Sequence, residues 1–146
     1  MGQQKSLQAY IRMHFPDGVC AECEEGPLAG SSFRLVSKWE KGDPSPLGRV
    51  KPTGGCLYLV GESDKSPDFV SQLEQSLEAA RADLKQLKVV GIEWTCEIMV
   101  YVGVDAVICR FVELPESLMG LVSSLESSIT FIVCLCENSS ADGKTQ

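Results

Sequence analysis

The chain has 146 residues, of which 44% are hydrophobic and 23% are charged, and this composition is typical of a globular protein of one domain. Its 20 acidic residues outnumber the 13 lysines and arginines, which leaves a net charge of −7. Contacts to phosphate groups need clustered lysine and arginine, so this charge argues against a nucleic-acid partner. It favours a basic protein partner, because complementary fields speed association. Solubility is the simpler explanation of the same charge.

The amino terminus and the cysteines predict a cytoplasmic protein. Residues 1–6 contain no apolar stretch of the kind found in secretion signals, and no apolar run reaches the ~20 residues that span a bilayer. Gly2 and Ser6 match the loose myristoylation pattern, but a single acyl chain anchors weakly without a polybasic neighbour. The seven cysteines are odd in number, so reduced thiols are expected rather than a disulfide framework. Four of them lie in strand-like runs: Cys96, Cys109, Cys134 and Cys136.

The first half of the chain predicts three strands. Residues 7–15 alternate between apolar and polar side chains, which indicates a strand with one core face. Residues 17–31 show no clear period and are expected to form a loop with at most one helical turn. A less regular strand follows over residues 33–39. Residues 42–55 contain three prolines and four glycines and predict an exposed loop, and residues 56–60 predict a short apolar strand.

A long amphipathic helix is predicted over residues 67–89. Ser66 is placed at its N-cap, and Pro67 suits the first helical position. Its apolar side chains recur at helical spacing. They are Phe69, Val70, Leu73, Leu77, Ala80, Leu84 and Leu87.

The second half predicts strand, strand, helix and strand. Residues 92–102 alternate strictly, and residues 106–114 form a second β-rich run. Residues 116–126 have helical spacing, and residues 129–135 are again β-rich. The predicted fold is therefore α+β, with an antiparallel sheet of five to six strands and two main helices packed on one face, as a variant of the ferredoxin-like sandwich. This domain covers residues 1–136, and residues 137–146 form a flexible polar tail.

The sequence offers only weak candidates for a metal site. Cys20 and Cys23 have the spacing of a metal or redox pair, and His14 could supply a third ligand. A structural zinc site needs four ligands, and no second cysteine pair stands nearby in the sequence. Glu24 and Glu25 follow the pair and would raise thiol pKa values, which argues against a thioredoxin-like role. No metal and no cofactor are expected.

No catalytic motif stands out either. His14 is the only histidine, which removes most general-base and triad schemes. Glu22, Glu24 and Glu25 are first of all a solvated run of charge. The pair Gly54–Gly55 does not match a phosphate loop, because no helix is predicted directly after it. The sequence therefore predicts a protein that is not an enzyme.

Trp39 is the first candidate for a contact with a partner. Trp94 belongs to the core alternation, whereas Trp39 stands before Glu40 and Asp43 at the start of the long loop. Buried aromatic side chains carry much of the energy of an interface. The predicted partner-binding surface comprises Trp39, Glu40 and Asp43 and extends to Glu22, Glu24 and Glu25.

From residue 33 to residue 135 the layout resembles a family of small bacterial proteins, the domain-of-unknown-function family four-two-seven-nine. The resemblance starts at Trp39-Glu40-Lys41-Gly42-Asp43, and residues 112–118 resemble the lead into the family's last helix. Residues 17–31 depart from the family pattern. Members are similar in size and acidity to the immunity proteins that neutralise bacterial toxins.

Two hypotheses follow for the function. The first is a non-enzymatic protein-binding module, for example an immunity-type protein that occludes a basic bacterial toxin. The second is a small enzyme or ligand-binding protein that uses the cleft under the loop of residues 42–55, with Cys20 or the Glu22–Glu25 group as its chemistry. The sequence leaves the oligomeric state open.

Overall fold

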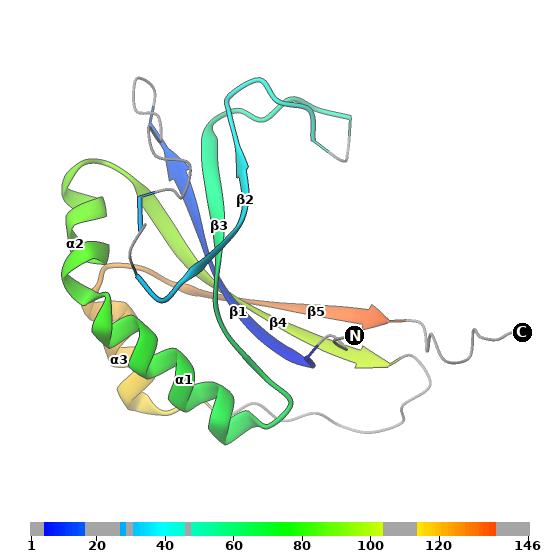
Figure 1. The fold of residues 1–146 in the computed structure, drawn as a ribbon, viewed down its shortest axis with the longest axis vertical. Helices are drawn as coiled ribbons and strands as arrows, with labels where there is room; N and C mark the ends of the chain where they lie inside the picture. The colour runs from blue at the N-terminus through cyan, green and yellow to red at the C-terminus, as the bar shows by residue number, and fades with distance from the viewer. Residues whose placement is uncertain (1–4, 17–26, 29–30, 46–47, 104–113, 137–146) are drawn as a thin grey trace, which may run out of the picture.

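A curved sheet with helices along one side forms the body of the molecule (Figure 1). The computed structural model describes residues 5–16, 27–28, 31–45, 48–103 and 114–136. Within them the strands are β1 (Leu7–Phe15), β2 (Arg34–Trp39), β3 (Gly54–Ser63), β4 (Glu93–Gly103) and β5 (Ile129–Cys136). The helices are α1 (Ser66–Ala79), α2 (Arg81–Val89) and α3 (Glu116–Ser124). The α+β class predicted from the sequence is confirmed.

The described sheet is mixed, so the prediction of a purely antiparallel sheet was wrong. Its strand order is β2-β3-β1-β4-β5, and only the last neighbours, β4 and β5, run parallel. The reason lies in the connection: α3 stands between these two strands in the chain, and a helical crossover returns the chain to start the next strand in the same direction. The strand predicted over residues 106–114 lies, except for Leu114, outside the described residues.

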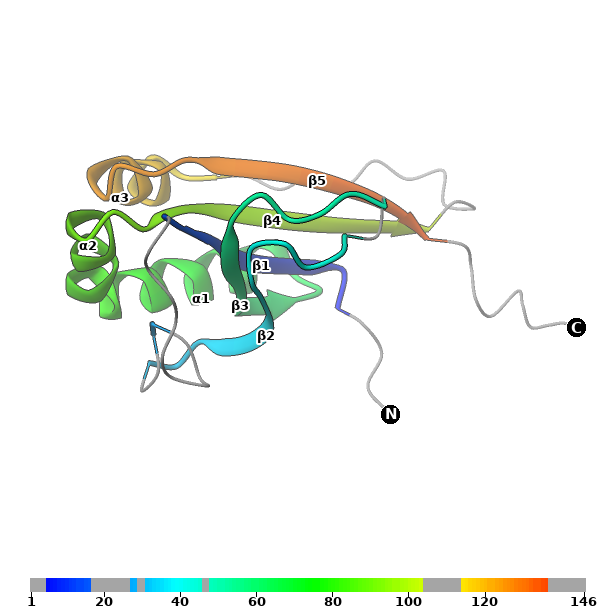
Figure 2. The same ribbon diagram turned by 90° about the horizontal axis from the view of Figure 1, so that it is seen from above.

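One face of the sheet carries the core. Every second residue of β1 is at most 4% exposed, and all three helices lie on this side of the sheet (Figures 1 and 2). Helix α1 packs on β3 and β1, while α2 packs on β4. Each fully buried aliphatic or aromatic side chain contributes about 1.5–3 kcal/mol. The buried residues of β1 are Leu7, Ala9, Ile11, Met13 and Phe15.

The helix predicted over residues 67–89 is two helices that meet at Ala80. The predicted apolar stripe continues across the break and is buried on both sides of it. Because no proline or glycine lies there, we attribute the break to packing against the twisted sheet, whose different strands α1 and α2 follow. Helix α1 also starts one residue early: Lys65 is its N-cap and Ser66 is already helical. None of the described helices is long and apolar enough to cross a membrane.

The loop predicted over residues 42–55 is a narrow hairpin in its described part. The amide of Gly42 donates to the carbonyl of Lys51, and the amide of Lys51 donates to the carbonyl of Asp43. The last two residues of the predicted loop, Gly54 and Gly55, belong to β3. The prediction failed there because glycine usually marks loops, whereas in this strand it allows a neighbour to approach closely.

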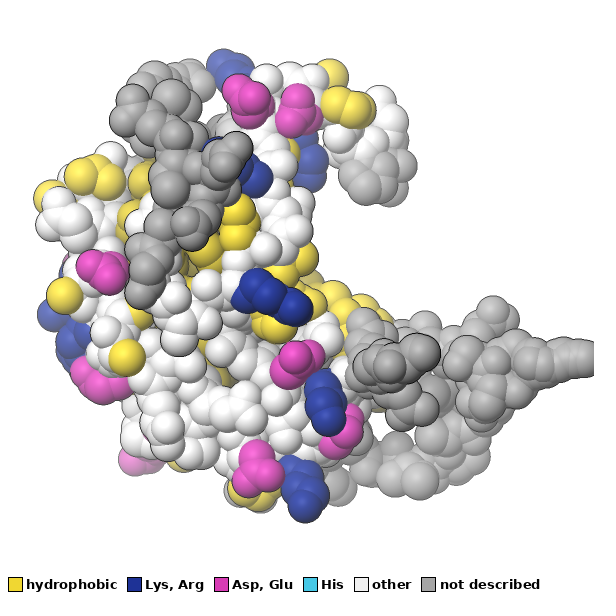
Figure 3. Space-filling view, in the orientation of Figure 1, with side chains coloured by type: hydrophobic (Ala, Val, Ile, Leu, Met, Phe, Trp, Pro, Cys, Tyr) yellow, Lys and Arg dark blue, Asp and Glu magenta, His cyan; other side chains and the backbone are white. Residues whose placement is uncertain are grey.

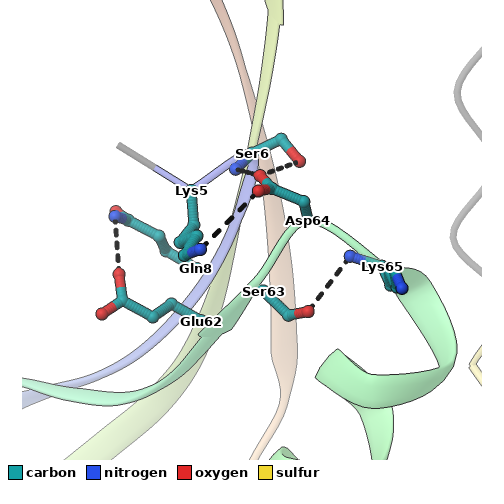
Figure 4. A network of polar contacts seen from close by, with 7 residues as sticks. All are labelled: Lys5, Ser6, Gln8, Glu62, Ser63, Asp64 and Lys65. Carbon is teal, nitrogen blue, oxygen red and sulfur yellow. Dashed lines mark hydrogen bonds and ion pairs between the residues drawn. The ribbon is translucent and has the colours of Figure 1, made fainter. Parts of the chain in front are cut away.

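A polar network fixes the start of β1 beside the end of β3 (Figure 4). The Asp64 carboxylate accepts hydrogen bonds from the amide and the hydroxyl of Ser6, at 2.9 and 3.1 Å, and forms an ion pair with Lys5 at 3.8 Å. The carbonyl of Ser6 accepts a hydrogen bond from the amide of Tyr101 in β4. The central strand β1 is thus held at one end to both of its neighbours.

Candidate functional site

The second face of the sheet has no described helix on it. It carries the polar residues that alternate with the core residues of β1, among them Tyr10, Arg12 and His14. Figure 3 shows that this side of the molecule is hollowed and that hydrophobic side chains gather in the hollow. Two polar residues of the sheet, Gln8 and Glu97, are only 7% and 9% exposed. A concave, partly desolvated face of this kind is the usual setting for a binding surface.

Trp39 is the last residue of β2 and lies over a glycine. The pairing of β2 with β3 places Trp39 opposite Gly55. A Cβ atom added to Gly55 would lie 2.6 Å from the Trp39 ring and 2.2 Å from the carbonyl oxygen of Met13. The indole Nε1 donates a hydrogen bond to the carbonyl of Thr53 at 3.1 Å. The absence of a side chain at Gly55 therefore lets the half-buried ring reach across β3 toward β1.

Two cations flank the Trp39 ring. The Lys51 Nζ lies 4.7 Å from the ring centroid, and the Arg12 Cζ lies 5.7 Å from it. The His14 ring meets Trp39 edge-on, with centroids 6.3 Å apart. Each cation–π contact contributes roughly 0.5–1 kcal/mol at a partly exposed site. We call Arg12, His14, Trp39, Lys51 and Gly55 the Trp39 cluster.

The guanidinium of Arg12 is held in place from β4. Its Nε donates to the Glu97 Oε2 at 2.6 Å, and the two side chains are 32% and 12% exposed. A charge-assisted hydrogen bond in such a sheltered place is stronger than one on an open surface. Arg12 is thus positioned between a carboxylate and an aromatic ring, which limits its rotamer freedom before any partner binds.

The surroundings of His14 lower its pKa. Partial burial is the main cause, and the positive charges of Arg12 and Lys51 add to it, while Glu97 acts in the opposite direction. The imidazole therefore resists protonation. Its Nδ1 lies 3.4 Å from the hydroxyl oxygen of Thr53.

Further along β1, Tyr10 joins a second polar group on the same face. Its hydroxyl donates to the Gln8 Oε1 at 2.5 Å, and Gln8 in turn donates to Glu62 at 3.5 Å. Burial raises the pKa of Tyr10, and its neighbours Tyr101 and Glu62 raise it further. The phenol therefore acts as a hydrogen-bond donor at neutral pH.

The structure places some of the residues predicted to form the site. Trp39 is on the concave face, and Glu40 and Asp43 are exposed in the turn that follows it. The Asp43 carboxylate accepts a hydrogen bond from the Glu40 amide at 2.8 Å, so it shapes this turn. The remaining predicted residues lie outside the described residues: Glu22, Glu24 and Glu25, together with the weak metal candidates Cys20 and Cys23.

Sequence reasoning did not assign Arg12, Lys51 or Gly55 to any site, and it named His14 only as a weak metal candidate. The alternation of residues 7–15 placed Arg12 and His14 on the polar face of the first strand, so their shared face could have been inferred from the sequence. A glycine inside a strand, such as Gly55, often marks the close approach of a neighbouring group. Lys51 gave no signal, because its position depends on the hairpin.

The chemistry of the described residues is sparse outside this face. Among them, no group of three or more histidine, cysteine or acidic side chains could hold a metal ion. Burial raises the pKa of the Cys56 thiol to about 11 and that of Cys96 to about 12, so neither is a ready nucleophile. A groove of about 790 Å³ separates α1 from α3, and Ser117 donates a hydrogen bond to Glu74 on its wall. In its described part the 42–55 hairpin packs on Trp39.

Comparison with known proteins finds no matching family model, no similar curated protein and no similar solved structure. The functional conclusions therefore depend on the geometry of the chain itself.

Proposed function

We propose that this chain is a non-enzymatic protein-binding module and that its binding surface is the concave face around the Trp39 cluster. The observation that carries the proposal is the half-buried Trp39 ring, which lies between Lys51 and Arg12 on a sheet face that no described helix covers. Large aromatic and arginine side chains dominate the energy of protein interfaces. Side chains that are already held in place lose less conformational entropy on binding.

The described titratable groups favour binding over catalysis. Glu97 is engaged by Arg12, and His14 packs against Trp39 with a lowered pKa. The thiols of Cys56 and Cys96 are buried. A catalytic site needs a nucleophile or base within hydrogen-bonding reach of a substrate, and these groups are directed instead toward the protein.

An immunity-type role, with a basic toxin as the partner, is a narrower form of this proposal. The net charge of −7 supports it. Lys51 and Arg12, which contact Trp39, argue against a basic partner at the concave face. In the groove between α1 and α3 a basic toxin would meet Glu74, whereas Glu78 on the same wall is already paired with Arg81 at 2.8 Å.

The experiment is co-purification of the tagged chain from its native cells, followed by reconstitution of the complex from two purified proteins. Replacing Trp39 by leucine should weaken such a complex at least about tenfold, as expected for an interface anchor. Val89→Ala is the control, because Val89 is 76% exposed on α2, and α2 packs on the opposite face of the sheet. Thermal unfolding shows whether each variant is folded at the temperature of the binding assay.

Three outcomes decide between the proposals. Loss of affinity with Trp39→Leu but not with Val89→Ala supports the concave face. Loss of affinity only with Glu74→Lys or Glu78→Lys moves the site to the groove and supports the immunity-type form. A purified chain that converts or tightly binds a small molecule, with no protein partner, would overturn both in favour of an enzyme or ligand-binding protein.

A further inference from the structure

The arm of the molecule that carries Trp39 differs in charge from the rest of the chain. Residues 34–53, which cover β2 and the hairpin, contain five lysines and arginines and two carboxylates and so have a net charge of +3. Because the whole chain has −7, the remaining residues carry −10. A cationic arm on an acidic protein attracts an acidic group to one place and repels it elsewhere, which orients the encounter.

Cations mark both ends of the concave face along β2. Lys51 and Arg12 lie at the Trp39 end. Arg34 lies at the other end of β2, opposite Leu59, which is in turn paired with Tyr10. The charge of Arg34 acts on the Tyr10 phenol, as expected if both side chains are on this face. The register shift between Leu35 and Ser37 brings Arg34 and Trp39 to the same face. Their partners Leu59 and Gly55 are four residue steps apart on β3, which corresponds to roughly 14 Å.

The floor between these cations is apolar. Leu57 is half-buried and pairs with Ser37 on one side and Arg12 on the other. Leu59 pairs with Arg34 and is 9% exposed. In an extended chain laid along this floor, every second side chain would face the sheet. Apolar side chains among these would contact the leucines, and carboxylates two residues before or after them would reach the cations at the two ends.

From this arrangement we propose that the concave face binds an extended acidic polypeptide segment, with Trp39 as the apolar anchor and Lys51 and Arg34 as the partners of its carboxylates. This inference rests on the proposed function and adds the chemistry of the partner. The Glu97 carboxylate does not occupy Lys51 or Arg34, because it is paired with Arg12. A nucleic acid is disfavoured, since a polyanion would meet the −10 of the remaining chain along most of its length.

The test uses fluorescein-labelled peptides of about ten residues with serine at every second position. The positions between the serines hold two central valines flanked on each side by glutamate, lysine or serine. A single-stranded oligothymidylate of similar length is tested beside them. Binding to the full chain is followed by fluorescence anisotropy at low and at physiological salt. The glutamate peptide should bind at least about tenfold more tightly than the lysine and serine peptides, and salt should reduce the difference.

Charge-reversal variants test whether the peptide binds at the concave face. Lys51→Glu and Arg34→Glu should each weaken binding of the glutamate peptide by roughly tenfold, corresponding to the loss of one well-placed charge contact. Lys85→Glu is the matched control, since it makes the same change in net charge on an exposed position of α2. If Lys51→Glu fails to fold, Lys51→Gln removes the charge with a smaller perturbation.

Other results overturn the inference. Equal or tighter binding of the lysine peptide, tighter binding of the oligonucleotide, or no binding of any peptide would each contradict an acidic ligand. An equal effect of Lys85→Glu would show attraction by net charge alone. If the lysine peptide binds and Trp39→Leu abolishes its binding, the face is still a protein-binding surface, so the proposed function stands while this inference fails.

Discussion

The two tryptophans of the chain occupy opposite faces of one sheet in closely similar ways. Each indole nitrogen donates to a backbone carbonyl, Trp94 to that of Leu84 and Trp39 to that of Thr53. Each ring also has a lysine over it, Lys88 at 5.6 Å and Lys51 at 4.7 Å. The difference is the cover: α2 lies on Trp94, which is 1% exposed, whereas Trp39 is only half-buried. A helical layer makes one ring part of the core, and its absence makes the other available to a partner.

The largest expected effect is on the covered face. Trp94→Ala should lower the free energy of unfolding by about 4 kcal/mol, because it removes a buried aromatic side chain and leaves a cavity beneath α2. Urea denaturation of the variant and the native chain measures this. A cost below that of Trp39→Ala would mean that the two rings have been assigned to the wrong roles.

Gly55→Ala should be the next most damaging change. The new Cβ would lie 2.2 Å from the backbone carbonyl of Met13 and 2.6 Å from the Trp39 ring, so the strands and the ring must shift, at a cost of roughly 3 kcal/mol. Gly120→Ala in α3 is the matched control, since its Cβ would meet no atom within 4 Å. Because alanine suits a helix better than glycine, that variant should gain about 0.5–1 kcal/mol. Denaturation midpoints of the two variants that move in the same direction would contradict the packing described at Gly55.

Trp39→Ala should cost about 2 kcal/mol, less than a fully buried tryptophan, because part of the ring already faces solvent. Combining it with Gly55→Ala sharpens the comparison. The alanine at position 39 removes the contact at 2.6 Å but not the contact with the Met13 carbonyl. The double variant should therefore be more stable than the sum of the single costs implies, and additive denaturation energies would show that the two positions do not interact.

The covered face could be predicted from the sequence far better than the open one. Apolar periodicity identified the buried faces of β1 and β4 and the apolar stripe shared by α1 and α2. An element that packs on its neighbour through one face has apolar residues at a regular period, which can be recognised in the sequence. The parallel direction of β5 could not be predicted from local pattern, since it depends on how the chain crosses from β4. The break at Ala80 has no local signal either, because no proline or glycine lies there.

The open face depends on contacts between residues that are far apart in the sequence. Trp39 could be singled out because it stood outside any core alternation. Its neighbours Arg12, Lys51 and Gly55 come from three separate segments that only the strand register brings together. Trp39 also proved to be partly structural, since its ring packs over Gly55, and that double role follows from the missing side chain at position 55.

The smallest expected effect is a pH dependence at His14. Its pKa in the folded chain is lowered by burial and by Arg12 and Lys51, with Glu97 opposing them, whereas in the unfolded chain it is close to the ordinary value of about 6.5. Below about pH 6.5 the unfolded chain therefore takes up the His14 proton more readily than the folded chain. As a result, the free energy of unfolding decreases as the pH falls from about 6.5 through the lower pKa of the folded chain. His14→Gln should make the free energy of unfolding less sensitive to pH between about pH 7 and pH 5 than in the native chain.

The charge change Lys51→Glu tests the same site from the other side. It replaces a cation that lowers the His14 pKa by an anion that raises it, so the histidine should titrate at a higher pH by NMR than in the native chain. Lys85→Glu again serves as the control, because it lies on α2, on the opposite side of the sheet. A His14 titration that is unchanged by Lys51→Glu would separate Lys51 from the Trp39 cluster and leave Trp39 with Arg12 alone as its cationic neighbour.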